Sequence, residues 1–229
     1  MRMDYGETKD EMLERLLAEE KPKCPHCNEP MQLWEVPHIA MGDGLGWGSP
    51  FLYICFNDGC PLYVGGWDSI ESNYAHKASH RCMNYPGTET FECLPVFSPE
   101  GGGGQVMDND VAAKQAAERE ALKRGFQILA DSYVTKNLVN MMTLLVDAGE
   151  PTRVRIKAAE MIGDVAEDTE CIEPMRSHRF GNRLLKEAVD TAVEKIHDRC
   201  FTRECPFCAE IVKKRAKVCK HCGKEIAGQ

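Results

Sequence analysis

Residues 24–27 read CPHC and residues 55–60 read CFNDGC, and twenty-seven residues separate the two groups. Short cysteine turns of this kind allow two sulfurs to reach one metal ion at about 2.3 Å, and two such turns complete a tetrahedral thiolate site. The spacing therefore predicts a metal site made of four thiolates. The expected ligands are Cys24, Cys27, Cys55 and Cys60.

The chain between and after these turns predicts strands. Residues 31–36 alternate in polarity, and residues 51–54 and 61–64 are short apolar runs rich in aromatic and β-branched side chains. The order of turn, strand, strand, turn and strand resembles a zinc ribbon, in which the metal supplies much of the folding free energy. The loop 37–50 is glycine-rich and carries Trp47, so we expect it to pack on the helical domain or on a partner.

A second cysteine group lies at residues 205–222, CPFCAEIVKKRAKVCKHC. This segment resembles the short terminal zinc ribbons written CPxCAExI…A…CxxCG, which implies four metal ligands. They are Cys205, Cys208, Cys219 and Cys222, and the spacing alone selects the same four. The ten residues 209–218 between the two turns form a second loop that such a ribbon would display.

Zinc is the expected ion at both sites, in a structural role, although iron also accepts four tetrahedral thiolates. CPHC also occurs in thiol oxidases of the thioredoxin fold, which leaves redox chemistry at Cys27 as an alternative. A third site made of His76, His80, Cys82 and Cys93 is a weaker possibility, because these residues form no second tight turn. His26 and His221 lie inside their turns and are expected to face solvent. No catalytic constellation and no small-molecule substrate site emerges from the pattern.

Helical patterns occupy most of the remaining chain. Residues 8–20 have apolar side chains at helical spacing, with Thr8 and Glu11 in the positions of a capping box. Residues 68–76 predict a short helix, and residues 79–97 an irregular segment or a hairpin. From Asn109, or from Asp110, a long helix is expected, with a core stripe that includes Phe126 and Tyr133 and an interruption at Gly125.

Three further helices are expected after residue 136. They occupy residues 138–146, the segment from Thr152 to Val165, and the segment from Leu184 to Ile196, with a break at residues 171–181. The sequence LVNMMTLLVDAGEPTRVRIKAAEMIGDVA, within residues 136–167, resembles a single HEAT repeat. That resemblance implies two antiparallel helices in close contact, with Asp147 and Arg155 at the charged positions of the repeat. No second copy is evident, so a small HEAT-like bundle is expected.

These patterns predict a modular α+β protein. Its expected parts are an N-terminal helix with a β-rich zinc ribbon and extension (1–100), a glycine-rich linker (101–108), an all-α HEAT-like helical domain (109–199) and a small C-terminal zinc ribbon (200–229). The acidic, polar N-terminus lacks the apolar core of a secretory signal, and no run is long enough for a membrane helix. The expected location is the cytoplasm, where paired cysteines usually bind metal.

Charge limits the range of partners. The chain has a formal net charge of −8, which argues against a general binder of polyanions. Residues 200–229 are the exception, with seven basic and three acidic side chains. Their basic cluster consists of Lys213, Lys214, Arg215, Lys217 and Lys220.

The expected function is that of a non-enzymatic zinc-binding adaptor or accessory subunit that binds a protein complex through its ribbons and helices. A nucleic-acid- or ribosome-associated regulator that uses the basic cluster is the first alternative. A thiol redox protein is the second.

Overall fold

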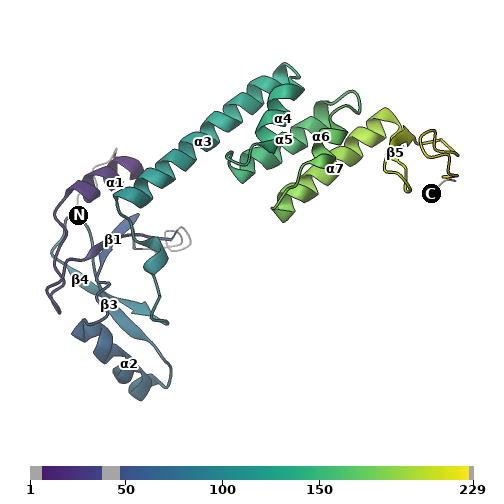
Figure 1. The fold of residues 1–229 in the computed structure, drawn as a ribbon. Helices are drawn as coiled ribbons and strands as arrows, with labels where there is room; N and C mark the ends of the chain where they lie inside the picture. Colours follow the sequence, from purple (N-terminus) through teal and green to yellow (C-terminus); the bar gives the residue numbers. More distant parts are fainter. Residues whose placement is uncertain (1–6, 38–46, 227–229) are drawn as a thin grey trace. The chain divides into compact units, whose positions relative to one another are not determined.

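A computed structural model of the 229-residue chain describes residues 7–37 and 47–226 (Figure 1). The chain divides into two compact units, Met1–Gln115 and Ala116–Gln229. In the described residues the fold is mixed α+β, with seven α-helices, a four-stranded antiparallel sheet and a two-stranded one. None of the helices in these residues has the length and the apolar character needed to cross a membrane.

The first unit is built on a four-stranded sheet in the order β1-β2-β3-β4. The strands are β1 (Gln32–Glu35), β2 (Phe51–Ile54), β3 (Ser79–Asn84) and β4 (Phe91–Val96). The two strands predicted between the cysteine turns are thus confirmed as β1 and β2, and residues 79–97 form the hairpin β3–β4. Helix α1 (Lys9–Ala18) precedes the sheet, and its capping box is confirmed: Thr8 N donates to Glu11 Oε2 at 2.7 Å, and Glu11 N donates to Thr8 Oγ1 at 3.3 Å.

The sheet buries apolar side chains on both of its faces. One core joins α1 to the sheet through Leu16, Leu33 and Phe51, and it also contains the first cysteine group. The opposite core contains Trp34 and Ile54 and is joined by Trp47. Residues 38–46 of the loop 37–50 lie outside the described residues. Because both faces are covered, the sheet does not depend on the metal alone for its burial.

The third predicted strand, residues 61–64, is wrong. This segment begins helix α2 (Pro61–Tyr74), which also takes the place of the short helix predicted at 68–76. Pro61 occupies the first turn, where its missing N–H costs no hydrogen bond. Gly66 then lets the helix approach β3, since a Cβ at this position would lie 2.2 Å from Ser79 Oγ and 3.2 Å from the backbone N of His80.

We expect Gly66→Ala to lower the free energy of unfolding of the first unit by about 1–3 kcal/mol, the usual cost of overpacking. The added methyl group must displace Ser79, whose hydroxyl donates to Tyr63 O at 2.5 Å. The matched control is Gly65→Ala, because a Cβ at Gly65 meets no atom within 4 Å. Urea denaturation of the two variants measures the difference. Equal midpoints for both variants would contradict the close approach of α2 to β3.

The glycine-rich segment expected as a linker is hydrogen-bonded to β1. Trp34 Nε1 donates to Gly102 O at 2.8 Å, and Met107 N donates to Leu33 O at 2.8 Å. A short 3-10 turn, η2 (Gly103–Gln105), lies between these contacts. The predicted division into four parts stays a prediction.

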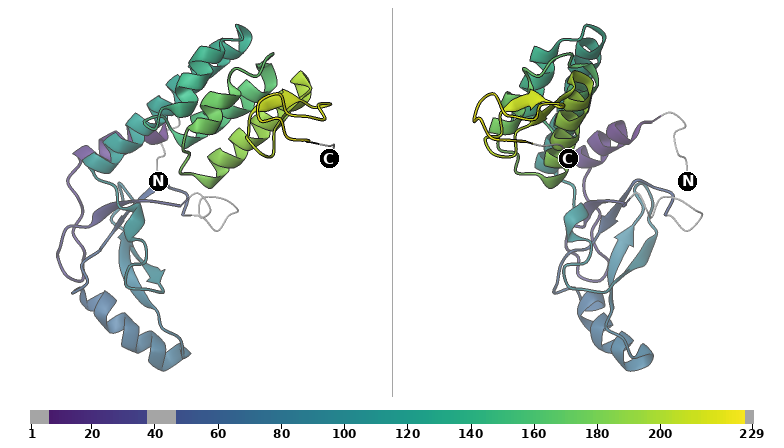
Figure 2. Two further views of the ribbon diagram at one scale, coloured as in Figure 1. Left: turned by 45° about the vertical axis from the view of Figure 1, so that its right-hand side comes forward. Right: turned by 90° about the vertical axis from the view of Figure 1, so that its right-hand side faces the viewer.

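The second unit contains most of α3 and the helices α4, α5, α6 and α7. Their bounds are α3 (Asn109–Val134), α4 (Leu138–Val146), α5 (Thr152–Val165), α6 (Ile172–Ser177) and α7 (Arg183–Cys200). One core joins them through Leu129, Leu145, Ile162, Val189 and Val193. Helices α5 and α7 pack along each other (Figure 2).

Several details of the predicted helices need correction. The cap of α3 is Asp108, which accepts a hydrogen bond from Val111 N at 2.8 Å, rather than Asn109 or Asp110. The helix runs through Gly125 without a break. Phe126 and Tyr133, predicted as core, are 38% and 44% exposed.

Two corrections concern the end of the bundle. The predicted break at residues 171–181 contains α6, and Leu184, counted in the core stripe of the last helix, is 56% exposed. Helices α4 and α5 occupy the segment that resembles a HEAT repeat, and the resemblance itself stays a prediction.

The C-terminal segment forms strands β5 (Thr202–Glu204) and β6 (Ile211–Lys213), which pair antiparallel. Polar contacts join it to the end of α7: His197 Nδ1 lies 2.9 Å from Thr202 Oγ1, and Lys214 Nζ lies 2.8 Å from Asp198 Oδ1. Arg176 of α6 bonds Glu204 at 3.0 Å. The small sheet is therefore attached to the helical core of its own unit.

Candidate metal centres

Three Cys-x-x-Cys turns share one backbone geometry. In the first, Asn28 N donates to Cys24 O at 2.8 Å and Cys24 N donates to Glu29 O at 2.9 Å. The turns that begin at Cys205 and Cys219 repeat both hydrogen bonds at the same relative positions. In each turn the residue after the second cysteine has a positive φ: Asn28 at 63°, Ala209 at 59° and Gly223 at 70°. This tight reversal brings the two sulfurs of each turn to one side.

The fourth turn, residues 55–60, is built differently. Gly59 N donates to the side chain of Asn57 at 2.9 Å, and Cys60 N donates to Asn57 O at 3.0 Å. Cys60 is also the N-cap of α2, so its sulfur lies at the positive end of a helix. Burial raises the pKa of the Cys60 thiol, and the nearby backbone N–H groups of Tyr63 and Leu62 act in the opposite direction. Such donors stabilise a thiolate.

The structure brings all eight predicted cysteines together in two groups of four. Within each group the sulfurs lie within 4.8 Å of one another. Cys24 and Cys60 are 3.9 Å apart, and Cys27 and Cys55 are 3.6 Å apart. In the second group the corresponding distances are 3.8 Å for Cys205–Cys222 and 3.7 Å for Cys208–Cys219.

These separations fit a tetrahedral metal ion. A Zn–S bond of about 2.3 Å gives sulfurs about 3.8 Å apart at the corners of a tetrahedron. A disulfide requires about 2.05 Å, and all twelve cysteines are free. Two four-cysteine sites that fit zinc are thus present, one in each unit, and four thiolates fill all four positions of each.

Hydrogen bonds to sulfur lower the pKa of one cysteine in each group, Cys27 in the first and Cys219 in the second. Burial opposes ionisation of Cys27, but donors from the Glu29 backbone and the Asn57 side chain lower the pKa of this thiol to about 7. In the second group the backbone N–H of Cys222 and that of His221 lower the pKa of Cys219 to about 6 against the effect of burial. A thiol with a lowered pKa loses its proton to a metal at neutral pH at little cost.

A buried arginine supports the first site, and the sequence did not reveal it. Arg81 in β3 is 2% exposed and donates to Cys55 O at 3.3 Å and to Pro99 O at 3.2 Å. Its guanidinium carbon lies 4.1 Å from the ring centroid of Tyr63. Four thiolates and one Zn²⁺ carry a net charge of −2, so a buried cation beside Cys55 offsets part of that charge.

We expect Arg81→Met to lower the free energy of unfolding of the first unit by about 2 kcal/mol and to speed zinc loss, because the carbonyls of the buried Cys55 and of Pro99 lose their donor. Asp58, which bonds Arg81 at 2.7 Å, has a side chain that is 76% exposed. The control Asp58→Asn is therefore expected to change stability by less than about 0.5 kcal/mol. Denaturation and the rate of zinc transfer to a chromogenic chelator measure both effects. Unchanged zinc release in Arg81→Met would contradict this role.

The structure does not assemble the weaker third site. In the described part of the chain, only the two four-cysteine groups meet the geometric requirement for a metal. His76 and His80 share no helical face, because His76 follows the end of α2 and His80 lies in β3. Cys82 and Cys93 are directly opposite on β3 and β4, but Cys82 is buried and Cys93 exposed. Burial raises the pKa of Cys82 to about 12, which keeps it protonated.

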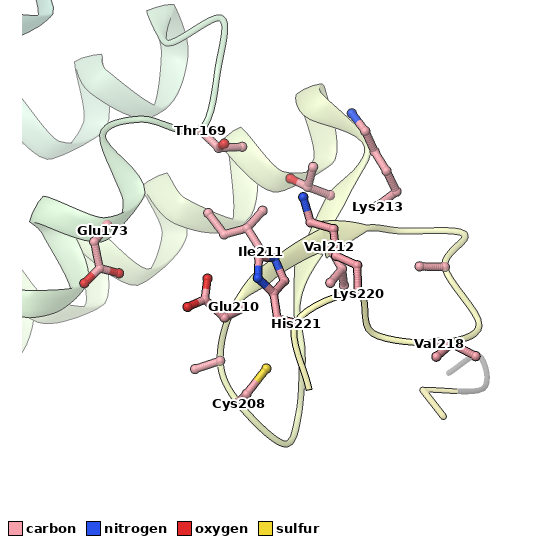
Figure 3. A pocket seen from close by; sticks show the side chains of 13 residues that line it. Thr169, Glu173, Cys208, Glu210, Ile211, Val212, Lys213, Val218, Lys220 and His221 are labelled. Carbon is pink, nitrogen blue, oxygen red and sulfur yellow. The ribbon is translucent and has the colours of Figure 1, made fainter. Parts of the chain in front are cut away.

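An open groove of about 820 Å³ lies beside the second site (Figure 3). Cys208, Glu210 and His221 line it from the turns, and Glu173 lines it from α6. The basic cluster lies on the same segment: Lys213, Lys214, Arg215, Lys217 and Lys220 are all exposed. Lys214 is engaged with Asp198, and Lys213 and Lys220 line the groove. His26 and His221 are exposed, as expected.

Comparison with known proteins identifies one part of the chain. Residues 201–226 match the family model of a zinc-ribbon domain. No curated protein and no solved structure matches the chain. The match covers β5, β6 and the four cysteines of the second group. The C-terminal segment is therefore a zinc-ribbon domain, and a second four-cysteine cluster lies in the N-terminal unit.

Proposed function

We propose that the protein is a non-enzymatic adaptor or accessory subunit in which two structural zinc ions hold binding surfaces in place. The closed geometry of both four-cysteine groups carries this proposal. Catalytic zinc keeps one position for water or substrate, whereas four thiolates leave none. Iron in the same donor set is the alternative ion.

Exposed apolar side chains in the helical unit support binding to a protein. Phe126 and Tyr133 lie seven residues apart on α3 and so share one face. Val134 and Val139 follow at the end of α3 and the start of α4, with exposures of 83% and 75%. Large apolar side chains that stay exposed along neighbouring helices are candidates for a protein interface. We name these four residues the α3–α4 patch and propose that it contacts a protein complex.

Native mass spectrometry and elemental analysis test the zinc component. Two zinc ions per chain are expected, and a spectrum without visible absorption separates zinc from iron. Fewer than two metal ions per chain would overturn the structural role proposed for both sites.

Quantitative affinity capture from native extract tests the adaptor component. The wild-type chain is expected to retain a defined protein in stoichiometric amount, and Phe126→Ser/Tyr133→Ser to lose it. Tyr74→Ser is the matched control, because Tyr74 is 72% exposed on α2, outside the α3–α4 patch. If the double variant captures the same protein in the same amount as the wild-type chain, the proposed surface is wrong.

The basic cluster keeps a second candidate, a nucleic-acid- or ribosome-associated regulator. Its five cations are exposed on the C-terminal ribbon, where phosphate contacts would give salt-dependent affinity. Charge reversal of Lys213, Lys214 and Arg215 separates the two candidates, since partner binding that is unchanged would eliminate the regulator. A redox role would instead require a reactive Cys27 and dispensable Cys55 and Cys60.

A further inference from the structure

The segment that joins α6 to α7 concentrates positive charge in an acidic chain. Residues 174–186 contain three arginines, one lysine and one histidine, and they contain no aspartate or glutamate. The segment borders a pocket of about 540 Å³, a size within the range of about 300–1,000 Å³ that is typical of small-molecule sites. This pocket is separate from both four-cysteine groups.

Two of the cations that line the pocket have no counter-ion among the described residues. The one carboxylate of the lining, Asp190, is bound by Arg176 at 2.6 Å. Arg179 and Lys186 have no ion pair within the described part of the chain, and both are exposed. Because both cations line the same hollow, an anion bound there could pair with both.

An aromatic pair forms another part of the lining. The rings of His178 and Phe180 are 4.6 Å apart between centroids and are inclined by 52°. The guanidinium carbon of Arg155 lies 5.9 Å from the Phe180 centroid and supports that ring from the helical core. Flat rings beside unpaired cations match a ligand that combines a phosphate with an aromatic base.

We propose that this pocket binds a nucleotide unit, with the phosphate at Arg179 and Lys186 and the base against the His178–Phe180 pair. The unit belongs either to a free nucleotide or to a strand of single-stranded nucleic acid, and both present the same chemistry. The site is distinct from the basic cluster of the C-terminal ribbon and does not depend on the adaptor function.

Three probes distinguish the sources: a fluorescein-labelled single-stranded RNA of twelve nucleotides, AMP and inorganic pyrophosphate. Fluorescence anisotropy follows the RNA and calorimetry follows the other two. If the protein binds RNA but not AMP, the ligand is a nucleic-acid strand. If it binds both, a single nucleotide is sufficient for binding. An intact chain that binds neither RNA nor AMP overturns the proposal.

Arg179→Glu/Lys186→Glu is expected to weaken binding of the nucleotide probe at least about tenfold. The slope of log K against log salt concentration for RNA binding should also fall by about 1.4, since each lost contact to a single strand is worth about 0.7. The control Lys114→Glu/Lys123→Glu changes the net charge equally at exposed positions outside the pocket and outside the basic cluster. It is expected to weaken binding less than about threefold. Equal losses in the two double variants would show attraction by net charge alone and would overturn the pocket.

His178→Ala tests the base. This variant is expected to weaken the binding of AMP or RNA by roughly five- to tenfold and to leave the binding of pyrophosphate unchanged. Stacking on a base requires the ring, whereas contact with phosphate does not. If pyrophosphate binds as tightly as AMP and His178→Ala changes neither, the assignment to a nucleotide is wrong. Equal binding of poly-glutamate and RNA would overturn it as well. Circular dichroism of each variant confirms that the helices are intact before binding is compared.

Discussion

Cys60→Ser is expected to unfold the N-terminal unit at 25 °C. Cys60 is 1% exposed, contributes one of four sulfurs to the first four-cysteine group and begins α2. A structural zinc site contributes about 10–16 kcal/mol to folding in small zinc domains. A whole domain is stable by only about 5–15 kcal/mol. Loss of most of the zinc-binding free energy is therefore larger than the stability that the apolar core provides by itself.

The choice of serine isolates the role of the metal. Serine is a preferred N-cap, so the start of α2 has a suitable capping side chain when the sulfur is lost. Native mass spectrometry should find one zinc per chain, held by the C-terminal ribbon, and NMR spectra should lose the dispersed signals of the sheet. Cys93→Ser, at an exposed cysteine on β4, is the control and should keep both ions. Retention of two zinc ions by Cys60→Ser would disprove the assignment of this ligand.

The cysteine spacing predicted the two four-cysteine groups because each turn is held by hydrogen bonds between residues close in the sequence. A Cys-x-x-Cys turn contains its own hydrogen bonds, as the repeated geometry at Cys24, Cys205 and Cys219 shows. The capping box of α1 is equally local, since Thr8 and Glu11 are three residues apart. Spacing along the chain is sufficient for such features.

The error at α2 has a physical origin. The run Leu62-Tyr63-Val64 favours a strand by composition, and Gly65-Gly66 disfavours a helix. Packing reverses both preferences, because Gly66 lets α2 lie against Ser79 of β3. Pro61 directly after a capping residue was the local signal for a helix start, and it was the better guide.

Arg81 could not be identified from the sequence. Its partners come from separate segments: Cys55, Asp58 and Pro99 accept its hydrogen bonds, and Tyr63 packs against its guanidinium. No spacing rule relates these positions, since the fold alone brings them together. The pocket at residues 174–186 is an intermediate case, because its charge pattern is visible in the sequence but its hollow is not.

Gly163→Val is expected to be the most damaging single substitution in the helical unit outside the metal ligands. Gly163 of α5 is buried where α5 meets α7. A Cβ at this position would lie 2.9 Å from Ala192 Cα and 3.0 Å from Ala192 Cβ. These atoms belong to the middle of α7 and cannot rotate away as the end of a flexible side chain can. Valine therefore has to separate the two helices.

That separation would also break a polar contact at the end of α5. Arg199 of α7 donates to Gly163 O at 2.8 Å and to Ala166 O, the carbonyls of a residue in the last turn of α5 and of its C-cap. Together these losses are expected to lower the free energy of unfolding by about 3 kcal/mol or more. The control is Gly181→Val, because a Cβ at Gly181 meets nothing within 4 Å. Guanidinium denaturation followed by the helical circular dichroism signal measures both variants, and a Gly163→Val midpoint equal to that of the control would show that α5 and α7 do not cross in this close contact.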